Sequence, residues 1–358
     1  MNHARIAVVV SGFPRLSETF AVNELLALAE RGVLAAIFAT KPGDSTRPQL
    51  RSERLSELLT VLPDDTADSQ AVEVANALND RNVKAVHGYF AHQPAEVAWR
   101  AAGRLGLPFG FSVHAKDARK ISSSELSIRA KRAACVIACN SDVASIIQNT
   151  GARVHLIPHG VNLDRFKASP LPRGRVFQIL AVGRLVEKKG FHFLIEAVSR
   201  LKFPFQLRII GAGPEQERLA QMIYAYHLLD HVTLCGPRTH DQLPEEYARA
   251  HVVAVPSIVD KTGDRDGLPN VVLEAMASGR AVVASNAGAI GAAVRDNETG
   301  LLLPAGDPLA LALALTRLAH DLPLRERLAT AAREHVEEHY EVKSCSERFC
   351  QLLEEVYA

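Results

Sequence analysis

The sequence is poor in cysteine and has no long hydrophobic run. Its 358 residues include five cysteines, and none belongs to a C-x-x-C pair or to a cysteine and histidine set with zinc spacing. This pattern excludes a disulfide framework and favours reduced thiols, so we expect a cytoplasmic protein. No apolar run approaches the about 20 residues of a membrane-spanning helix. The run at residues 6–10 is too short for the hydrophobic part of a signal peptide.

Charge of one dominant sign is also missing. The 41 lysine and arginine residues nearly balance the 40 aspartate and glutamate residues, which leaves a net charge of +1. The chain therefore has no global attraction to nucleic acid, and we expect no nucleic-acid partner. One local run is basic, and we interpret it as a solvated helix face. The alternative is a patch that makes weak peripheral contact with a membrane or binds an anionic acceptor. The run consists of Lys116, Arg119, Lys120, Arg129, Lys131 and Arg132.

Several motifs of enzyme chemistry are absent from the sequence. There is no G-x-S-x-G nucleophile elbow, no H-E-x-x-H metal site and no Walker phosphate loop. Gly211 and Gly213 follow a strand pattern, but the third glycine of the dinucleotide fingerprint is missing, which favours a tight turn over nicotinamide binding. His87 and His92 do not have the i, i+4 spacing of a helical metal pair, so we interpret both as structural.

Short apolar runs alternate with longer helical patterns through most of the chain. Continuous apolar strands between helices predict a parallel sheet with helices on both faces. A proline- and glycine-rich stretch at 167–174 interrupts the alternation, which restarts with a strand at 176–182. The tail from Asp307 has only helical patterns. We therefore expect an α/β protein with one domain at 1–170 and a second at 171–340, facing each other across a cleft.

Two carboxylates lie eight positions apart at the start of a short predicted helix. Asp266 lies in the loop before this helix, and Glu274 lies about one turn inside it. A helix N-terminus offers free N–H groups and the positive end of a dipole, so it is suited to an anion. A ligand with a central phosphate and hydroxyl-rich ends, such as a nucleotide sugar, fits this arrangement. An ordinary capped helix with two solvated acids is the alternative.

A second phosphate-binding candidate is the loop at 183–190, which follows the first strand of the second half. Arg184 provides a planar fork for phosphate oxygens, and Lys189 provides a compact charge. Two cations in such a loop suit a diphosphate, including one that gains charge as it leaves. A charged surface turn is the alternative interpretation.

The first half offers two further candidates at the ends of strands. Gly12 permits close approach of its loop to a ligand, and Ser17 is placed to cap a predicted helix at 17–31. His114 ends another strand at the same predicted edge, although a single histidine is more often structural.

Together these segments resemble the retaining glycosyltransferases of family 4, which have the GT-B fold of two Rossmann-like domains. The opening at 13–20 is similar to a subgroup that acts in exopolysaccharide assembly. The resemblance covers nearly the whole chain, and the motifs occur in the family's order. They are the segments 157–166, 183–190, 266–274 and 299–308.

The resemblance implies a role for each candidate residue in binding a donor sugar. Arg184 and Lys189 would hold the diphosphate, and Glu274 the ribose hydroxyls. Asp266 takes the place of the first glutamate of the family's E-x7-E motif, which contacts the transferred sugar, and His114 would touch the same sugar. The remaining candidates are Gly12 near the phosphate, Gly236 and Pro237 beside the base, and the N–H groups of Asn270 and Val271 on the phosphates or the sugar.

Two positions depart from the family's pattern. Asp266 is one methylene shorter than glutamate but keeps the charge. The family commonly has Gly-Gly-Ile-Pro-Glu where this chain has 288–292, so the usual acid is replaced by Ala292. The resemblance also implies that the final segment, 341–358, is a helix that crosses back onto the first domain.

The implied activity is transfer of a hexose from a nucleotide-diphosphate sugar to a hydroxyl acceptor with retention of configuration. A UDP-sugar is favoured over a GDP-sugar as the donor. The acceptor would be a glycan, a lipid-linked sugar or a small metabolite, and no metal or other cofactor is expected. A sugar-nucleotide epimerase or a phosphorylase on the same plan is one alternative. A non-catalytic nucleotide-sugar-binding subunit, suggested by Asp266 and Ala292, is another.

Overall fold

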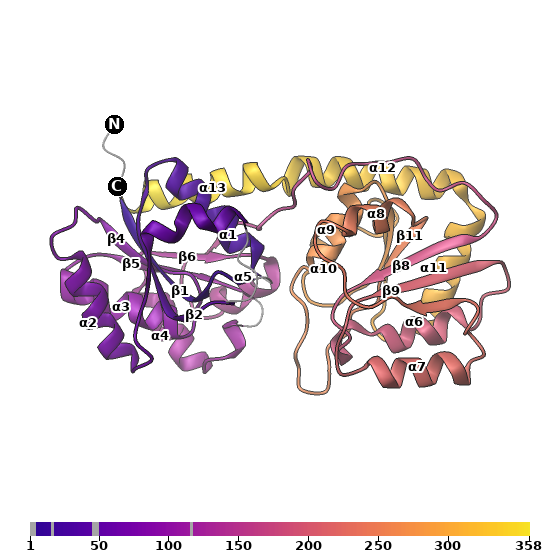
Figure 1. The fold of residues 1–358 in the computed structure, drawn as a ribbon, viewed down its shortest axis with the longest axis horizontal. Helices are drawn as coiled ribbons and strands as arrows, with labels where there is room; N and C mark the ends of the chain where they lie inside the picture. The colour runs from indigo at the N-terminus through magenta and orange to yellow at the C-terminus, as the bar shows by residue number, and fades with distance from the viewer. Residues whose placement is uncertain (1–4, 16–17, 45–49, 115–116) are drawn as a thin grey trace. The chain divides into compact units, whose positions relative to one another are not determined.

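The computed structural model describes residues 5–15, 18–44, 50–114 and 117–358, and the chain folds into two compact units (Figure 1). Unit 1 consists of Met1–Gly160 and Val342–Ala358, and unit 2 consists of Val161–Glu341. The predicted Ser17 cap and Lys116 of the basic run lie outside the described residues. No helix in the described part of the chain is both long and apolar enough to cross a membrane.

The boundary between the units lies at 160 and 161 rather than at 170, because the predicted linker belongs to unit 2. Phe166 is part of the apolar core of unit 2. The buried guanidinium of Arg280 donates to the carbonyl of Ser169 at 2.7 Å. Nε2 of His251 lies 3.0 Å from the carbonyl oxygen of Pro172. These contacts bind the proline-rich stretch to unit 2, so it is not a free linker.

Unit 1 is built on a seven-stranded parallel sheet with the strand order β3-β2-β1-β4-β5-β6-β7. The strands are β1 Ile6–Phe13, β2 Leu34–Pro42, β3 Leu59–Val61, β4 Ala85–Gly88, β5 Phe109–Val113, β6 Cys135–Ala138 and β7 His155–Leu156. The helices are α1 Thr19–Glu30, α2 Ala67–Leu78, α3 Gln93–Leu105, α4 Ser123–Arg132, α5 Ser141–Gln148 and α13 Val342–Val356, with 3-10 turns η1 Leu50–Leu58 and η2 Asp117–Arg119.

Helices cover both faces of this sheet, as the continuous apolar strands predict. One apolar cluster joins the sheet to α2, α3, α4 and α5. The other joins it to α1, η1 and α13. The C-terminal helix is therefore part of unit 1, and the chain returns to this unit after unit 2.

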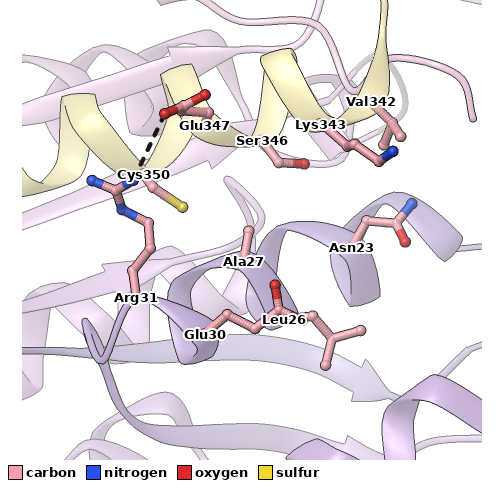
Figure 2. A pocket seen from close by; sticks show the side chains of 10 residues that line it. All are labelled: Asn23, Leu26, Ala27, Glu30, Arg31, Val342, Lys343, Ser346, Glu347 and Cys350. Atoms are coloured by element: carbon pink, nitrogen blue, oxygen red, sulfur yellow. Dashed lines mark ion pairs between the residues drawn. The ribbon is translucent and has the colours of Figure 1, made fainter.

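α13 packs along α1, and the two helices border a groove of about 280 Å³ (Figure 2). The contact between the two helices is apolar, since Cys350, which lines the groove, and Leu353 are both buried. At its edge Arg31 donates to both carboxylate oxygens of Glu354, at 3.2 and 2.7 Å. This two-pronged pair fixes the end of α13 against the end of α1.

Unit 2 has a six-stranded parallel sheet with the order β10-β9-β8-β11-β12-β13. Helices α6, α7 and α11 share an apolar cluster on one face, and α8, α9 and α10 share one on the other. The strands are β8 Phe177–Val182, β9 Phe205–Ile210, β10 Val232–Leu234, β11 Val252–Val255, β12 Ala281–Ser285 and β13 Leu301–Leu303. The helices are η3 Glu187–Lys189, α6 Phe191–Val198, α7 Gln216–Ala225, α8 Leu243–Ala248, α9 Asn270–Ala277, α10 Ile290–Ala293, α11 Pro308–His320 and α12 Leu322–His339.

The basic run is not a uniformly solvated helix face. Arg129 is buried, donates to the carbonyl of Ala91 at 2.7 Å and pairs with Glu96 at 2.7 Å. Lys131 and Arg132 are exposed, as predicted. The interpretation is wrong for Arg129, because its position on α4 faces the α3 side of the unit and a carboxylate there offsets its charge.

Candidate functional site

The loops that follow the strands of unit 2 pack closely at the carboxyl edge of the sheet. Gly288, after β12, has a φ of +59°, and a Cβ on it would collide with the carbonyl oxygen of Asp266. The amide of Ala289 donates to the carbonyl of Gly267 at 3.0 Å. The loop before α9 is therefore held by backbone contacts at a position where no side chain fits.

Lys189 and Asp266 form an ion pair at this edge. Nζ of Lys189 lies 2.7 Å from Oδ2 of Asp266, and the same oxygen accepts from the hydroxyl of Ser257 at 3.1 Å. Lys188 is buried and lies 3.0 Å from Asp264 and 3.6 Å from Asp266. Two lysines therefore face two aspartates. Lys189 and Asp266 were predicted to bind one donor, but their ion pair was not predicted.

The electrostatics of this cluster favour a charged Asp266. Burial alone raises the pKa of the Asp266 carboxyl. Lys189 and Lys188, together with the hydroxyl of Ser257, outweigh burial and hold this pKa below its ordinary value. The ammonium of Lys189 is thereby held at a fixed point, ready for a further anion.

Arg184 lies on the same loop as Lys189 and is exposed. In the described part of the chain its guanidinium has no hydrogen-bond or ion-pair partner. A free planar fork beside a fixed ammonium is suited to the oxygens of a diphosphate. The structure thus places both predicted cations on the loop between β8 and α6.

Helix α9 begins at Asn270, directly after Pro269, with no side-chain cap. The amides of Asn270 and Val271 donate to no acceptor within the described ranges. Asn270 is exposed and Val271 is half-buried, so this first turn is accessible. This turn has free N–H groups and the positive end of the helix dipole, an arrangement that suits an anion.

Glu274 is not a solvated acid, so the ordinary-cap alternative is wrong for this residue. Its side chain is buried, and Oε2 accepts from the hydroxyl of Tyr247 at 2.8 Å. Nε2 of His240 lies 3.2 Å from Oε1. Burial and the neighbouring Glu274 raise the pKa of Tyr247 well above its ordinary value, which keeps the phenol as the donor. Tyr247 and His240 orient this carboxylate, and neither was predicted from the sequence.

The turn predicted to flank the base follows β10. The carbonyl of Gly236 accepts from the amide of Gly211 at 3.0 Å, and Pro237 is exposed. Ala292, the position that departs from the family's pattern, lies on α10 and is exposed. An acid at this position would reach solvent without displacing buried atoms.

In unit 1 the predicted residues Gly12 and His114 both lie at the carboxyl ends of strands. Gly12 was predicted in the loop after the first strand but lies inside β1, because β1 stays paired with β2 up to Phe13. A Cβ on Gly12 would lie 2.5 Å from the carbonyl oxygen of Pro42, so β1 packs closely on the end of β2. His114 is buried, and its amide donates to Oδ1 of Asp117 at 2.5 Å. Neither ring nitrogen of His114 has a hydrogen-bond partner.

Other aromatic rings surround His114. Phe90 and His159 have ring centroids 4.8 and 5.0 Å from that of His114. Nδ1 of His159 lies 2.8 Å from Oε1 of Glu24, and Tyr89 donates to the other oxygen of this carboxylate. Sequence reasoning missed Glu24. Its signal is an acid among the apolar residues of α1, where its neighbour Leu25 is fully buried.

His87 has the structural role that was predicted for it. Its ring nitrogens lie 3.1 Å from the hydroxyl of Tyr357 and 2.9 Å from that of Ser112. Burial lowers the pKa of His87 to about 3, so the ring is neutral. Within the described residues there is also no group of three or more histidine, cysteine, aspartate or glutamate side chains arranged to hold a metal ion.

Comparison with protein families gives two adjoining matches. Residues 17–165 match Glycosyltransferase Family 4, and residues 164–335 match Glycosyl transferases group 1. The second match contains the Lys189, Asp266 and Glu274 cluster, and the first contains His114.

Relatives with named roles are bacterial glycosyltransferases. The chain is 25% identical to the putative colanic acid biosynthesis glycosyltransferase WcaL of Escherichia coli, over 96% of this chain and 97% of that protein. It is 27% identical to the amylovoran biosynthesis glycosyltransferase AmsK of Erwinia amylovora, with the same coverage of 96% and 97%. The WcaL protein of Salmonella typhimurium is 34% identical, but that match spans 55% of this chain and 50% of the relative.

Solved structures agree on the fold. Anabaena Alr3699/HepE, crystallised in complex with UDP, has a TM-score of 0.83 and 19% identity, over 98% of this chain and 100% of that one. Sucrose-phosphate synthase from Thermosynechococcus elongatus has a TM-score of 0.79 and 22% identity, over 99% of both chains. The chain belongs to family 4 of the glycosyltransferases and has their GT-B fold of two Rossmann-like parallel-sheet domains.

Proposed function

We propose that this protein transfers a hexose from a nucleotide-diphosphate sugar to a hydroxyl acceptor with retention of configuration. We favour a UDP-sugar over a GDP-sugar as the donor. The observation that carries the proposal is the Lys189–Asp266 ion pair at 2.7 Å, beside the free guanidinium of Arg184. The first turn of α9 offers two further N–H donors at Asn270 and Val271. The preference for UDP draws support from the HepE structure, which contains UDP.

In the proposed reaction, unit 2 binds the donor. Arg184 and Lys189 bind the diphosphate, and the buried carboxylate of Glu274 accepts hydrogen bonds from the ribose. As the bond between the anomeric carbon and the phosphate oxygen breaks, negative charge grows on the leaving diphosphate. Fixed cations and N–H groups stabilise that charge because they need no reorientation as it develops.

Retention follows when the acceptor attacks from the face that the diphosphate leaves. The departing phosphate oxygen takes the acceptor's proton, so the reaction needs neither a protein nucleophile nor a pair of glycosidase carboxylates. Side-chain cations supply the positive charge, and the proposal accordingly includes no metal. Asp266 and His114 contact the transferred sugar in this scheme.

The acceptor is proposed from the named relatives. WcaL and AmsK are named for colanic acid and amylovoran biosynthesis, which are polysaccharide pathways. We therefore propose a glycan or a lipid-linked sugar as the acceptor and favour both over a small metabolite. We also propose that the protein makes a weak peripheral contact with the membrane. None of the five cysteines forms a disulfide bond, which agrees with the proposed cytoplasmic location.

The test replaces Lys189 by alanine and measures release of UDP or GDP from a panel of nucleotide sugars. We expect turnover to fall by about 100-fold or more, because one fixed charge on the leaving group is lost. Lys202→Ala is the matched control, since Lys202 is an exposed lysine of the same unit outside the site. Wild-type turnover in Lys189→Ala would overturn the proposal.

A second candidate function is a non-catalytic nucleotide-sugar-binding subunit. It is favoured by the two departures from the family's pattern, the shorter acid Asp266 and the missing acid at Ala292. Thermal shift with UDP, GDP, ADP and their sugars measures binding separately from chemistry. Tight binding without bond cleavage in any acceptor screen would favour this candidate, and slow donor hydrolysis would favour the enzyme.

A further inference from the structure

The carboxylate of Glu274 is held from two sides by side-chain donors. Glu274 of α9 is 5% exposed. The hydroxyl of Tyr247 donates to Oε2 at 2.8 Å, and Nε2 of His240 lies 3.2 Å from Oε1. A carboxylate has about four lone-pair sites, two on each oxygen. Among the described residues these two donors fill one site on each oxygen, so each oxygen can accept one more hydrogen bond.

The two donors are themselves fixed by their surroundings. Phe166 is buried and packs edge-on against both rings, with centroid distances of 5.2 Å to His240 and 5.8 Å to Tyr247. The guanidinium of Arg165 contacts the other ring nitrogen of His240, Nδ1. Neither ring can rotate away from Glu274 without losing these contacts. The direction of the carboxylate is therefore set before a ligand arrives.

The two sides of this carboxylate differ in their access to solvent. Tyr247 is fully buried, whereas the side chain of His240 is 37% exposed and that of Arg165 is 38% exposed. The Tyr247 side is thus closed by the core of unit 2. A ligand reaches Glu274 from the His240 side.

The helix directs Glu274 toward the first turn of α9. Glu274 lies four residues after Asn270, so both are on one face of the helix, a turn apart. Helical side chains lean toward the N-terminus of their helix. The carboxylate is therefore directed toward the amides of Asn270 and Val271, which we propose to bind phosphate. In a nucleoside diphosphate the ribose is attached directly to the first phosphate, so its two hydroxyls come next to this position.

We propose that Tyr247 and His240 are positioning residues that turn the two remaining acceptor sites of Glu274 onto the 2′- and 3′-hydroxyls of the donor's ribose. They thereby select ribonucleotide sugars over 2′-deoxyribonucleotide sugars. The inference rests on the proposed function, which assigns the ribose to Glu274. A 2′-deoxy donor leaves one oxygen of a buried carboxylate without its partner. A site built to accept from a hydroxyl rejects an analogue that lacks it, because the desolvated acceptor then stays unpaired.

The first test measures binding to the wild-type chain by calorimetry. The ligands are UDP, GDP, their 2′-deoxy forms and inorganic pyrophosphate. We expect the ribonucleotide that binds to do so about 10-fold or more tightly than its 2′-deoxy form, because the hydrogen bond that is lost involves a charged acceptor. Equal affinity for the two forms overturns the proposal.

The second test removes the buried donor with Tyr247→Phe. The carboxylate is then free to turn, so the preference for the ribonucleotide should fall to about threefold or less. Affinity for pyrophosphate should stay at the wild-type value, since Arg184 and Lys189 bind it without Tyr247. Tyr224→Phe, at an exposed tyrosine of α7, is the matched control and should keep the full preference. An unchanged preference in Tyr247→Phe, or an equal loss of affinity for pyrophosphate, contradicts the positioning role.

A pair of variants at His240 tests the other donor and serves if Tyr247→Phe does not fold. His240→Gln keeps an amide donor near the place of Nε2 and should retain most of the preference. His240→Leu removes the donor and should lose it, again with pyrophosphate affinity unchanged. Equal preferences in the two variants would exclude His240 from the positioning role.

Turnover separates this inference from the proposed function. Ribonucleotide preference without any sugar transfer overturns the proposed enzyme and leaves the ribose selection in place. Transfer at equal rates from a ribonucleotide sugar and its 2′-deoxy form overturns the ribose selection and leaves the enzyme in place. A chain that binds no nucleoside diphosphate overturns both.

Discussion

At the scale of single residues, the main feature of the candidate site in unit 2 is an aspartate that faces two lysines. Asp266 and its neighbours Lys188 and Lys189 are all largely buried, with side-chain exposures of 12%, 8% and 14%. A buried ion pair contributes little to the net free energy of unfolding. Removal of one partner is nevertheless strongly destabilising, because it leaves an uncompensated buried charge. The cluster therefore links the stability of the site to pH.

Asp266→Asn tests this link. The folded pKa of Asp266 lies below its ordinary value of 3.8. The carboxylate therefore stabilises the fold above about pH 4, and this stabilisation is lost as the pH falls through the folded pKa. We expect Asp266→Asn to lower the free energy of unfolding of unit 2 by about 2 kcal/mol at pH 7. Below pH 4 its stability should decline less steeply than that of the wild type.

Urea unfolding between pH 3 and 7 measures both quantities. Asp264→Asn is the comparison, since Asp264 pairs with Lys188 at 3.0 Å but is 32% exposed and should contribute less. Equal pH dependence of the wild type and Asp266→Asn would show that this carboxylate does not contribute to acid unfolding.

The sequence was sufficient to group the donor-side residues but not to pair them. Arg184, Lys189 and Asn270 follow strands of one parallel sheet, so their gathering at one edge could be predicted from the order of elements. The pairing of Lys189 with Asp266 depends on how two loops pack. Glu24 and His159 are 135 positions apart and meet only through the tertiary fold. No local pattern carries such a contact.

At the scale of elements, the C-terminal segment packs closely on the sheet of unit 1, and this packing limits the size of the side chains that β5 can have. A Cβ on Gly110 would collide with the hydroxyl of Tyr357 and would lie 2.5 Å from the carbonyl oxygen of Cys135. The tyrosine is able to move, but the backbone of β6 is held by its ladder to β5. A side chain at Gly110 therefore strains the sheet itself.

Gly110→Ala is expected to destabilise unit 1 by about 1–3 kcal/mol, the typical cost of overpacking a core. Gly103→Ala is the matched change, because Gly103 is an exposed position of α3 where an added Cβ would have no atom within 4 Å. That change should stabilise the protein by about 0.5–1 kcal/mol through helix propensity. Thermal unfolding of the two variants should thus shift in opposite directions. Equal shifts would contradict the contact at Gly110.

Strong elements were predictable and weak ones were not. Strand β11 Val252–Val255 is a continuous apolar run, and in β9 Phe205–Ile210 buried apolar residues alternate with half-buried polar ones, so both strands can be recognised in the sequence. Strand β3 Leu59–Val61 was not predicted, since it has three residues and lies at the sheet edge with Val61 exposed. Helix α2 was also missed, although Thr66 caps it by accepting from Ser69.

At the scale of the whole molecule, the two units have separate cores, and α13 belongs to the first. Leu353 of α13 is fully buried in the cluster that contains β1 and α1. The division of the chain was predictable from the break in its pattern near residue 170. Its position at 160 was not, because hydrogen bonds to Arg280 and His251 decide which unit holds the proline-rich stretch.

Leu353→Ala should loosen unit 1 alone. Loss of a buried leucine typically costs about 2–5 kcal/mol. We expect hydrogen exchange, followed by mass spectrometry, to accelerate in β1, β4 and β5 and to stay unchanged in β8, β9 and β11. Leu309→Ala, at an exposed leucine of α11, serves as the control and should change neither set. Faster exchange in both units for Leu353→Ala would contradict the assignment of α13 to unit 1.

The return of α13 to unit 1 has a consequence for biosynthesis. Unit 2 is one continuous stretch, 161–341, whereas unit 1 lacks a helix until Val342–Val356 has been made. Domains fold as units while the chain emerges from the ribosome, N-terminal residues first. The second unit in the sequence is thus the first to be complete. Until α13 has been synthesised, the apolar face of α1 that packs against it remains exposed. We expect chaperones to bind the nascent chain at this face.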